Sequence, residues 1–210
     1  MAITQSDVLA WLAALQTVFS ENRRWLTDLD SPIGDADHGI NMERGFSAVT
    51  AELAQHPQAD MAGILKSAAM TLIRTVGGAS GPLYGTFFLR AGATCAGKSE
   101  LQPSDVMALF QAGVEGVRQR GKAEPGDKTM LDALLPAVQA MQQALHDGAG
   151  IAGMLEQAAA AAEQGMMGTI AMQAKKGRAS YLGPRSIGHQ DPGATSAYLL
   201  LQTAARVWHI

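Results

Sequence analysis

Three aspartates near the start of the sequence are the residues best suited to chemistry. Asp30, Asp35 and Asp37 fall within eight residues, and Pro32 and Gly34 bend the chain between them. Carboxylates this close repel one another unless a cation joins them. Oxygen ligands without cysteine favour Mg²⁺ or Ca²⁺. We therefore interpret the cluster as a metal site, with an Asp-rich helix N-cap as the alternative that the residues alone leave open.

The position of the aspartates narrows the kind of metal site. Counted from Asp35, the twelfth residue is Phe46, whereas an EF-hand calcium loop needs Glu there. Mg²⁺ takes one or two carboxylates and fills its other positions with water and substrate phosphates. Three aspartates therefore suit two Mg²⁺ shared with a polyphosphate. The adjacent His38 is expected to contact a phosphate or support the ligands rather than to bind metal.

Two glycine-rich stretches in the middle of the chain could contact the same ligand. Around Ala79 and Ser80, small residues allow backbone N–H groups to approach a ligand closely, although an ordinary helix cap is the alternative. The stretch Gly121–Thr129 is close to the sequence pattern of a P-loop. However, Asp127 precedes its Lys-Thr pair and no strand is predicted before it, so the Walker A motif is rejected. Gly121 and Met130 remain candidates for backbone and apolar contact with a nucleotide.

A fourth stretch, Lys175–Ser196, contains a basic turn and a helix start. Arg178 can stabilise charge on a transferring phosphoryl group. Asp191-Pro192-Gly193 opens the last predicted helix and could fix a ribose or a base edge. The alternatives are a solvated basic turn and a plain helix cap.

The composition limits the classes of protein to which the chain can belong. The chain has 210 residues, 47% of them hydrophobic, which suits a single domain of residues 1–210 with a substantial core. A net charge of −3 argues against nucleic-acid binding, and no stretch reaches the ~18 apolar residues of a membrane span. A single cysteine, Cys95, excludes a disulfide within the chain. With no signal-peptide pattern, the expected location is the cytoplasm.

Helical periodicity accounts for most of the sequence. The chain is rich in Ala, Leu, Met and Gln and poor in β-branched runs, which favours helix. We predict an all-α fold, an antiparallel bundle or ring of eight helices, with Pro136 kinking the sixth. The predicted starts lie near Ser6, Asp37, Met61, Pro82, Ser104, Asp127, Ile151 and Pro192; the seventh helix extends to about Met172 and the last to Val207.

The order of loops and helices should bring the candidate residues together. The acidic loop and the three glycine-rich stretches lead into the second, fourth, sixth and eighth predicted helices. In an up-and-down bundle these four helices start at the same end, so their free N–H groups and positive dipole ends face one space. The sequence therefore predicts an anion site beside the aspartates.

Four motifs, taken in order, resemble one known family. They are Gly34–Gly39 with Asp30 ahead of it, Gly77–Pro82, Pro125–Thr129 and Gly188–Ala194, and the likeness extends over essentially the whole chain. The sequence is similar to the nucleotide-binding L subunit of dihydroxyacetone kinases. The resemblance implies a barrel of eight antiparallel up-and-down helices with a nucleotide site at one end.

The same resemblance implies a set of site residues. Two Mg²⁺ would be held by Asp30, Asp35 and Asp37, and Arg178 would act on the transferring phosphoryl group. The residues implied to surround ADP or ATP are His38, Gly39, Ile40, Asn41, Ala79, Ser80, Gly121, Met130, Arg178, Asp191, Pro192 and Gly193.

The resemblance also implies partners. In this family a separate K subunit holds dihydroxyacetone, so this chain would only deliver the phosphoryl group. One variant exchanges ATP, whereas the other keeps ADP bound and has it rephosphorylated by the M subunit of the phosphotransferase system. The length of the chain, that of an L subunit alone, favours the second variant. The alternatives are an L-type subunit for another small acceptor and a nucleotide-sensing module that regulates a partner. A transcription regulator as a partner is left open. A homodimer is left open.

Overall fold

Long helices make up most of residues 2–209, which are the residues that the computed structural model describes. Two 3₁₀ helices and two very short strands complete this range, and the predicted all-α class is confirmed. The elements are β1 (Ile3–Thr4), α1 (Gln5–Glu21), α2 (Arg23–Asp30), α3 (His38–Gln55), α4 (Met61–Thr75), α5 (Ser80–Ala93), β2 (Glu100–Leu101), α6 (Pro103–Gly121), α7 (Leu131–His146), α8 (Ile151–Gly168), η1 (Thr169–Ala171), η2 (Arg178–Ser186) and α9 (Pro192–Val207).

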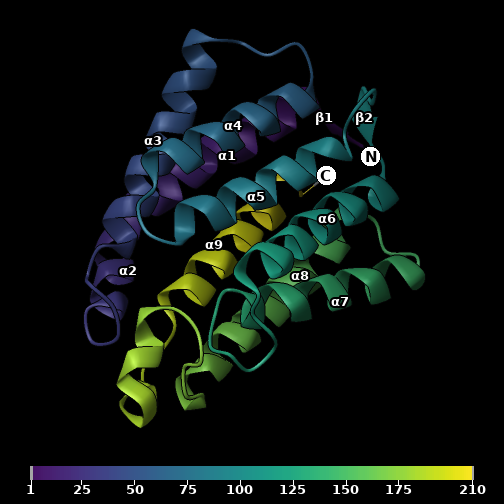
Figure 1. Ribbon diagram of the computed structural model, residues 1–210. Helices are drawn as coiled ribbons and strands as arrows, with labels where there is room; N and C mark the ends of the chain where they lie inside the picture. Colours follow the sequence, from purple (N-terminus) through teal and green to yellow (C-terminus); the bar gives the residue numbers. More distant parts are fainter. Residues whose placement is uncertain (1, 210) are drawn as a thin grey trace.

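Eight of these helices pack in a closed ring (Figure 1). Each helix from α3 to α8 contacts the next one along the chain, α1 contacts α3, and α9 returns to pack against α1. Consecutive helices run back and forth, so the predicted eight-helix up-and-down barrel is confirmed. The short α2 is additional to the ring and lies against α3.

Helix α2 is an element that the sequence analysis does not predict. Asn22 leaves the helical conformation, with φ −96° and ψ 7°. Its side-chain amide donates to the carbonyl of Val18 at 2.8 Å, a local bond that competes with helix continuation. The chain then re-enters helix, and Asp30 is the last residue of α2. The first candidate metal ligand is therefore positioned by a short helix.

Two predicted helix boundaries are wrong by several residues. Helix α7 starts at Leu131 rather than near Asp127. The Asp132 carboxylate accepts the N–H groups of Gly126 and Thr129 at 2.6 and 2.8 Å, which holds the preceding residues in a turn. The second boundary is the end of α8 at Gly168, where η1 replaces the last turn predicted up to about Met172.

A glycine of α8 packs against the carbonyl of α7 that a proline leaves without its helical donor. The helix continues through Pro136, but proline has no N–H, so the carbonyl of Asp132 lacks its helical donor. A Cβ atom on Gly165 of α8 would lie 2.0 Å from that carbonyl oxygen. Glycine is therefore required for α8 to pack this closely, while the predicted kink of α7 stays a prediction.

Aromatic side chains fill the centre of the ring. Trp11 contacts Phe88, Phe110 and Trp208, and Phe110 also contacts Trp208, with ring centroids 4.9 to 6.2 Å apart. The indole N–H of Trp11 donates to a carbonyl of α9 at 3.3 Å, and that of Trp208 donates to a carbonyl of α1 at 2.9 Å. Buried indoles need such partners. This aromatic cluster joins the first and last helices and closes the ring.

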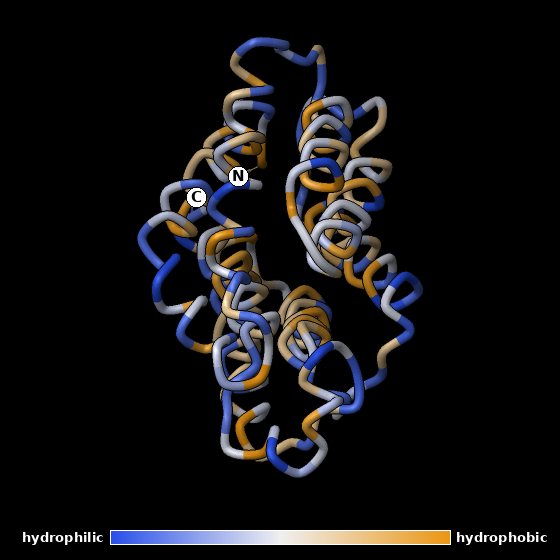
Figure 2. The backbone as a smooth tube through the Cα atoms, turned by 60° about the vertical axis from the view of Figure 1, so that its left-hand side comes forward, coloured by the Kyte–Doolittle hydropathy of each residue, from blue (hydrophilic) through white to orange (hydrophobic). Residues whose placement is uncertain are grey.

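Hydropathy alternates along the helices, as expected for amphipathic helices around a shared core (Figure 2). The connecting loops are mostly hydrophilic in the same view. Within residues 2–209, no helix is both long enough and apolar enough to cross a membrane.

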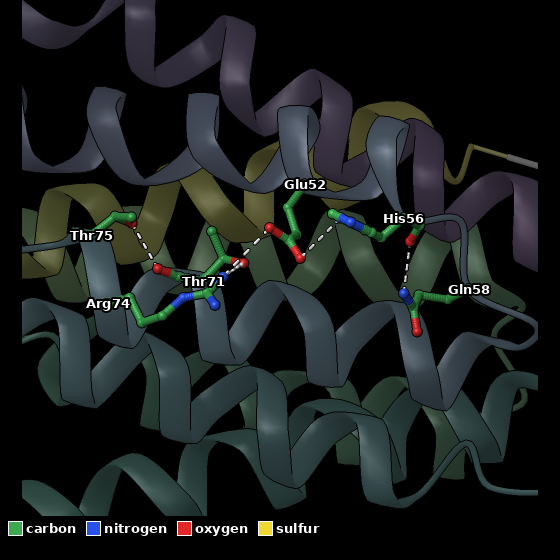
Figure 3. A network of polar contacts seen from close by, with 6 residues as sticks. All are labelled: Glu52, His56, Gln58, Thr71, Arg74 and Thr75. Atoms are coloured by element: carbon green, nitrogen blue, oxygen red, sulfur yellow. Dashed lines mark hydrogen bonds and ion pairs between the residues drawn. The ribbon is translucent and has the colours of Figure 1, made fainter.

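A polar network links α3 to α4 on the outside of the ring (Figure 3). The Glu52 carboxylate lies 3.5 Å from the guanidinium of Arg74 and 3.4 Å from the ring of His56. Arg74 also donates to the Thr71 hydroxyl at 3.2 Å. Exposed ion pairs of this kind contribute about 0–1 kcal/mol each, so the buried core rather than this network determines how the helices pack.

Candidate functional site

A pocket opens at the end of the ring where the N-termini of α3, α5, α7 and α9 meet. The loops before these helices lie together at the lower left of Figure 1. The predicted convergence of the four helix starts is therefore confirmed. The lining includes His38 and Asn41 from α3, Gly77 to Ser80 before and at the start of α5, Lys128 to Met130 before α7, and Asp191 to Gly193 at the start of α9.

Asp30 is the most firmly held of the three aspartates. Its side chain is buried, and one carboxylate oxygen accepts the backbone N–H groups of Asp37 and His38 at 3.0 and 3.2 Å. Its own carbonyl accepts the N–H of Gly34 at 2.6 Å. A Cβ atom on Gly34 would lie 1.9 Å from the other carboxylate oxygen of Asp30, so glycine is needed for the loop to fold back onto this carboxylate.

The three aspartates fit a magnesium site. Carboxylate oxygens of Asp30, Asp35 and Asp37 all lie within 4.8 Å of one another. Asp30 is buried and oriented, whereas the other two are accessible to water and to a ligand. Mg²⁺ prefers such hard oxygen donors and keeps several positions for water and phosphate. The donor set is therefore suited to magnesium bound together with a phosphate-containing ligand.

Arg178 stands at the rim of the pocket, at the start of η2. Its guanidinium lies 2.9 Å from the carboxylate of Asp35. Two-thirds of the Arg178 side chain is exposed, at 67%, so this ion pair contributes little to stability. The ion pair instead positions Arg178, because it holds this strong phosphate-binding group beside the acidic cluster.

His38 is the centre of a buried hydrogen-bonded chain beneath the pocket. Its Nε2 lies 2.9 Å from the hydroxyl of Ser196, and its Nδ1 lies 3.3 Å from the hydroxyl of Ser80. Tyr84 donates its hydroxyl proton to Ser196 at 2.7 Å. Burial lowers the pKa of His38 to about 4, although Asp30 and Asp37 partly offset this effect. The ring is therefore neutral and joins α3, α5 and α9.

Asp191 caps α9 at the opposite wall. Its carboxylate accepts the N–H of Ala194 at 2.7 Å. Burial raises the pKa of Asp191 to about 7, and the charges of Asp132 and Asp30 raise it further, whereas the Ala194 bond and the Lys128 ammonium lower it. The pocket thus concentrates negative charge, and bound cations would relieve the repulsion.

Most of the residues expected at the site line this one pocket. They are Asp30, Asp35, Asp37, His38, Asn41, Ala79, Ser80, Met130, Arg178, Asp191, Pro192 and Gly193. Their roles as ligands stay predictions. The residues that the structure places outside the lining are Gly39, Ile40 and Gly121.

The three outlying residues have other surroundings. A Cβ atom on Gly39 would lie 2.0 Å from the carbonyl oxygen of Arg23, so Gly39 faces α2. Ile40 is partly exposed beside Arg23 in a separate surface depression. Gly121 is the last residue of α6 and approaches Leu83.

Sequence reasoning missed several residues of the site. Lys128 belongs to the pocket lining. It lies in the stretch Gly121–Thr129, whose likeness to a P-loop indicated a role, although the all-α fold agrees with rejecting a Walker A motif. Ile33 and Ala179 also line the pocket, but single apolar residues outside a periodic helix carry no sequence signal. Ser196 and Tyr84 act from within helices, where only the fold reveals that they meet His38.

Comparisons with known proteins agree with this fold. A family model described as the DAK2 domain matches residues 32–206. The chain therefore belongs to the DAK2-domain family, and the resemblance seen in the sequence is confirmed.

Two relatives match over almost their whole length. The chain is 47% identical, over 98% of both chains, to the ADP-binding subunit DhaL of the PEP-dependent dihydroxyacetone kinase of Escherichia coli (strain K12). It is 40% identical, again over 98% of both chains, to the ADP-binding subunit DhaL of the PTS-dependent dihydroxyacetone kinase of Lactococcus lactis subsp. lactis (strain IL1403).

A solved structure shares the fold. It is the dihydroxyacetone kinase of C. freundii in complex with AMP-PNP and Mg²⁺, with a TM-score of 0.73 and 24% identity. The match covers 98% of this chain and 34% of that chain. At this identity the likeness supports the helical architecture alone.

Proposed function

We propose that this chain is the ADP-binding subunit of a dihydroxyacetone kinase that draws its phosphoryl groups from phosphoenolpyruvate through the phosphotransferase system. The observation that carries the proposal is the single pocket that joins three carboxylates to four helix N-termini. The two full-length relatives named above support the same activity. Within the pocket, ADP would be phosphorylated to ATP and would then pass the phosphoryl group on.

The residues of the pocket divide the task of holding a charged nucleotide. Backbone N–H groups at the starts of α5 and α9 would donate to phosphate oxygens, aided by the helix dipoles. Asp30, Asp35 and Asp37 would hold two Mg²⁺. When bound, these ions would offset the negative charge of the nucleotide phosphates. Met130 and Pro192 line the pocket and offer apolar contact to a base.

Arg178 would act on the phosphoryl group itself. Its guanidinium already lies at the rim beside Asp35, and it presents several N–H donors in a fork that matches phosphate oxygens. Donors that are positioned before the reaction stabilise the charge on a transferring group at no further cost of reorganisation. Removing Arg178 should therefore slow transfer more than it weakens nucleotide binding.

Two partners follow from this proposal. A K-type subunit would bind dihydroxyacetone and present it to the pocket, and an M-type subunit would return a phosphoryl group to ADP. With the nucleotide seated between the helix starts, the transferring phosphoryl group would face the open mouth near Arg178. Each partner would therefore dock in turn over the same mouth.

Reconstitution tests the proposed function. The purified chain is combined with a K-type subunit, an M-type subunit, the general phosphotransferase proteins and phosphoenolpyruvate, and dihydroxyacetone phosphate is measured. We expect turnover without added ATP, and its loss when any one component is omitted. Turnover that requires free ATP in amounts matching the product would instead support the ATP-dependent variant. A lack of turnover under both conditions would reject a role in this kinase.

A further inference from the structure

The segment Met172–Ile187, which we call the strap, covers one side of the pocket. It carries Arg178 and Ala179 into the pocket lining. Its apolar residues do not join the main core. Ala174 and Ala179 instead form a small separate cluster with Ile33 of the acidic loop. So little apolar burial contributes weakly to holding the strap, and its position must depend on polar contacts.

Lys128 makes those contacts at both ends of the strap. Its ammonium group donates to the carbonyl of Met172 at 3.1 Å and to the carbonyl of Ser186 at 2.6 Å. The residue is only 1% exposed. One side chain therefore brings together two carbonyls that are fourteen positions apart in the sequence.

Backbone bonds around Lys128 reinforce the same closure. The N–H of Lys175 donates to the carbonyl of Asp127 at 3.0 Å. The N–H of Ala174 donates to the hydroxyl of Ser186 at 2.9 Å. Lys128 itself has φ 62°, in the left-handed region that ordinary residues seldom adopt. A lysine held in this conformation indicates that the position is fixed by its surroundings.

The charge of Lys128 is compensated by carbonyl oxygens rather than by an ion pair. Within residues 2–209, no ion pair is formed by its ammonium group, although Asp191 is near enough to raise its pKa against the lowering effect of burial. A buried charge needs hydrogen bonds to be tolerated. Two of the three ammonium protons are already directed at strap carbonyls, so this lysine is not arranged like the phosphate-binding lysine of a P-loop.

We propose that Lys128 is a positioning residue that pins both ends of the strap and thereby sets where Arg178 stands over the pocket. This inference rests on the proposed function only for the identity of the ligand in the pocket. The closure itself is a property of the chain alone. Loss of the ammonium should free the strap, so that Arg178 no longer meets the ligand in a fixed place.

Limited proteolysis of the full chain tests the closure without reference to any ligand. Trypsin can cut the strap after Lys175, Lys176, Arg178 and Arg185. The test variant is Lys128→Met, which keeps most of the side-chain length and removes the donor. The matched control is Lys122→Met, because Lys122 is exposed and also has a positive φ, of 49°. The wild type and all variants are stripped of nucleotide with EDTA before digestion.

We expect strap cleavage to be about tenfold faster or more in Lys128→Met than in the wild type, since two charge-assisted hydrogen bonds are lost. Lys122→Met should be cut at the wild-type rate. Lys128→Arg should restore most of the protection, because a guanidinium can reach both carbonyls. If Lys128→Met does not fold by circular dichroism, Lys128→Gln, which retains a donor, serves with an expected intermediate rate.

Nucleotide kinetics give the second measurement. With ADP and Mg²⁺ bound, Lys128→Met should release ADP about tenfold faster, and kcat should fall more than KM rises in the reconstituted kinase. If Lys128→Met resists trypsin as well as the wild type does but binds ADP more weakly, the proposal is overturned, because Lys128 would then be a direct phosphate ligand. Unchanged proteolysis and unchanged ADP release would overturn it as well. Faster cleavage in a chain that binds no ADP would support the closure and reject the proposed function.

Discussion

The carboxylate of Asp30 is useful at this site because its neighbours hold it still. Two backbone N–H groups fix one of its oxygens, while Gly34 leaves room for the other. Asp35 and Asp37 are more exposed and complete the cluster. The types of these residues and their spacing were visible in the sequence. The backbone that orients Asp30 was not, because hydrogen bonds between a carboxylate and a loop depend on the folded path of the chain.

Removing either accessible aspartate should strongly weaken nucleotide binding without unfolding the chain. Asp35→Ala or Asp37→Ala is expected to weaken Mg²⁺-dependent ADP binding by more than about tenfold, since even supporting residues of metal sites have effects of this size. Titration calorimetry with ADP and Mg²⁺ measures the change, and circular dichroism reports the fold. The control is Asp28→Ala, whose carboxylate is 68% exposed in a surface ion pair. Equal ADP affinity in the test and control variants would contradict the metal assignment.

Gly34 gives a second test at the residue scale. The Cβ atom in Gly34→Ala would meet the Asp30 carboxylate at 1.9 Å, so the loop or the carboxylate must move. We expect a loss of about 1–3 kcal/mol in the free energy of unfolding, together with weaker Mg²⁺-dependent binding of ADP. Gly153→Ala in α8 is the control, because its Cβ would meet its nearest neighbour at an ordinary 3.7 Å. Tight ADP binding by Gly34→Ala would show that the loop does not depend on this close approach.

At the scale of elements, helix caps and hydrophobic periodicity in the sequence predicted several helix starts correctly. The predicted starts of α4, α8 and α9 match the structure at Met61, Ile151 and Pro192. The predicted start of α7 lies too early in the chain because the Asp132 carboxylate binds the backbone of the turn before the helix. An aspartate within a helical pattern does not indicate such hydrogen bonds. The sequence predicts no helix where η2 lies in the strap, since short 3₁₀ turns lack a periodic apolar stripe.

The N-terminus of α9 should carry a measurable pH dependence. Asp191 has a pKa of about 7 in the folded chain against about 3.9 when unfolded. Between about pH 4 and pH 7 the folded chain therefore retains a proton that the unfolded chain has released. Its contribution to the free energy of unfolding is greatest below this range and falls as the pH rises through it.

Asp191→Asn removes this titration and keeps a residue that can cap the helix. In urea denaturation of the nucleotide-free chain, the stability of the variant relative to that of the wild type should increase as the pH rises from about 4 to about 7. The other charges near the carboxylate, Asp132, Asp30 and Lys128, are unchanged by the substitution. Identical pH slopes for the two proteins would mean that Asp191 is ionised without penalty in the fold.

At the scale of the whole molecule, the order of the elements predicted the site better than any one motif did. Alternate helices of an up-and-down ring start at the same end, which is enough to place four loops around one pocket. What the sequence could not show is how the ring closes. That depends on contacts such as those between Trp11 and Trp208, which lie almost two hundred residues apart and carry no local pattern.

The closure of the helix ring can be tested by substitutions in the aromatic cluster. Trp208→Ala removes a fully buried indole and its bond to the carbonyl of Asp7, and we expect a loss of about 3–5 kcal/mol in the free energy of unfolding. The matched control is Trp25→Ala, since Trp25 is 39% exposed and should change stability far less. Urea denaturation followed by far-ultraviolet circular dichroism measures both. Similar losses in the two variants would contradict a ring closed by this cluster.

The nucleotide content of the purified chain tests the central claim most directly. The wild-type protein is dialysed at length with Mg²⁺, then with EDTA, and bound nucleotide is released and identified by chromatography after each step. We predict a stoichiometric amount of ADP that survives the first dialysis and is lost in the second, because the aspartates hold the nucleotide through metal. A chain that carries no nucleotide and binds none when ADP and Mg²⁺ are supplied would contradict the account, as would ADP that stays bound in EDTA.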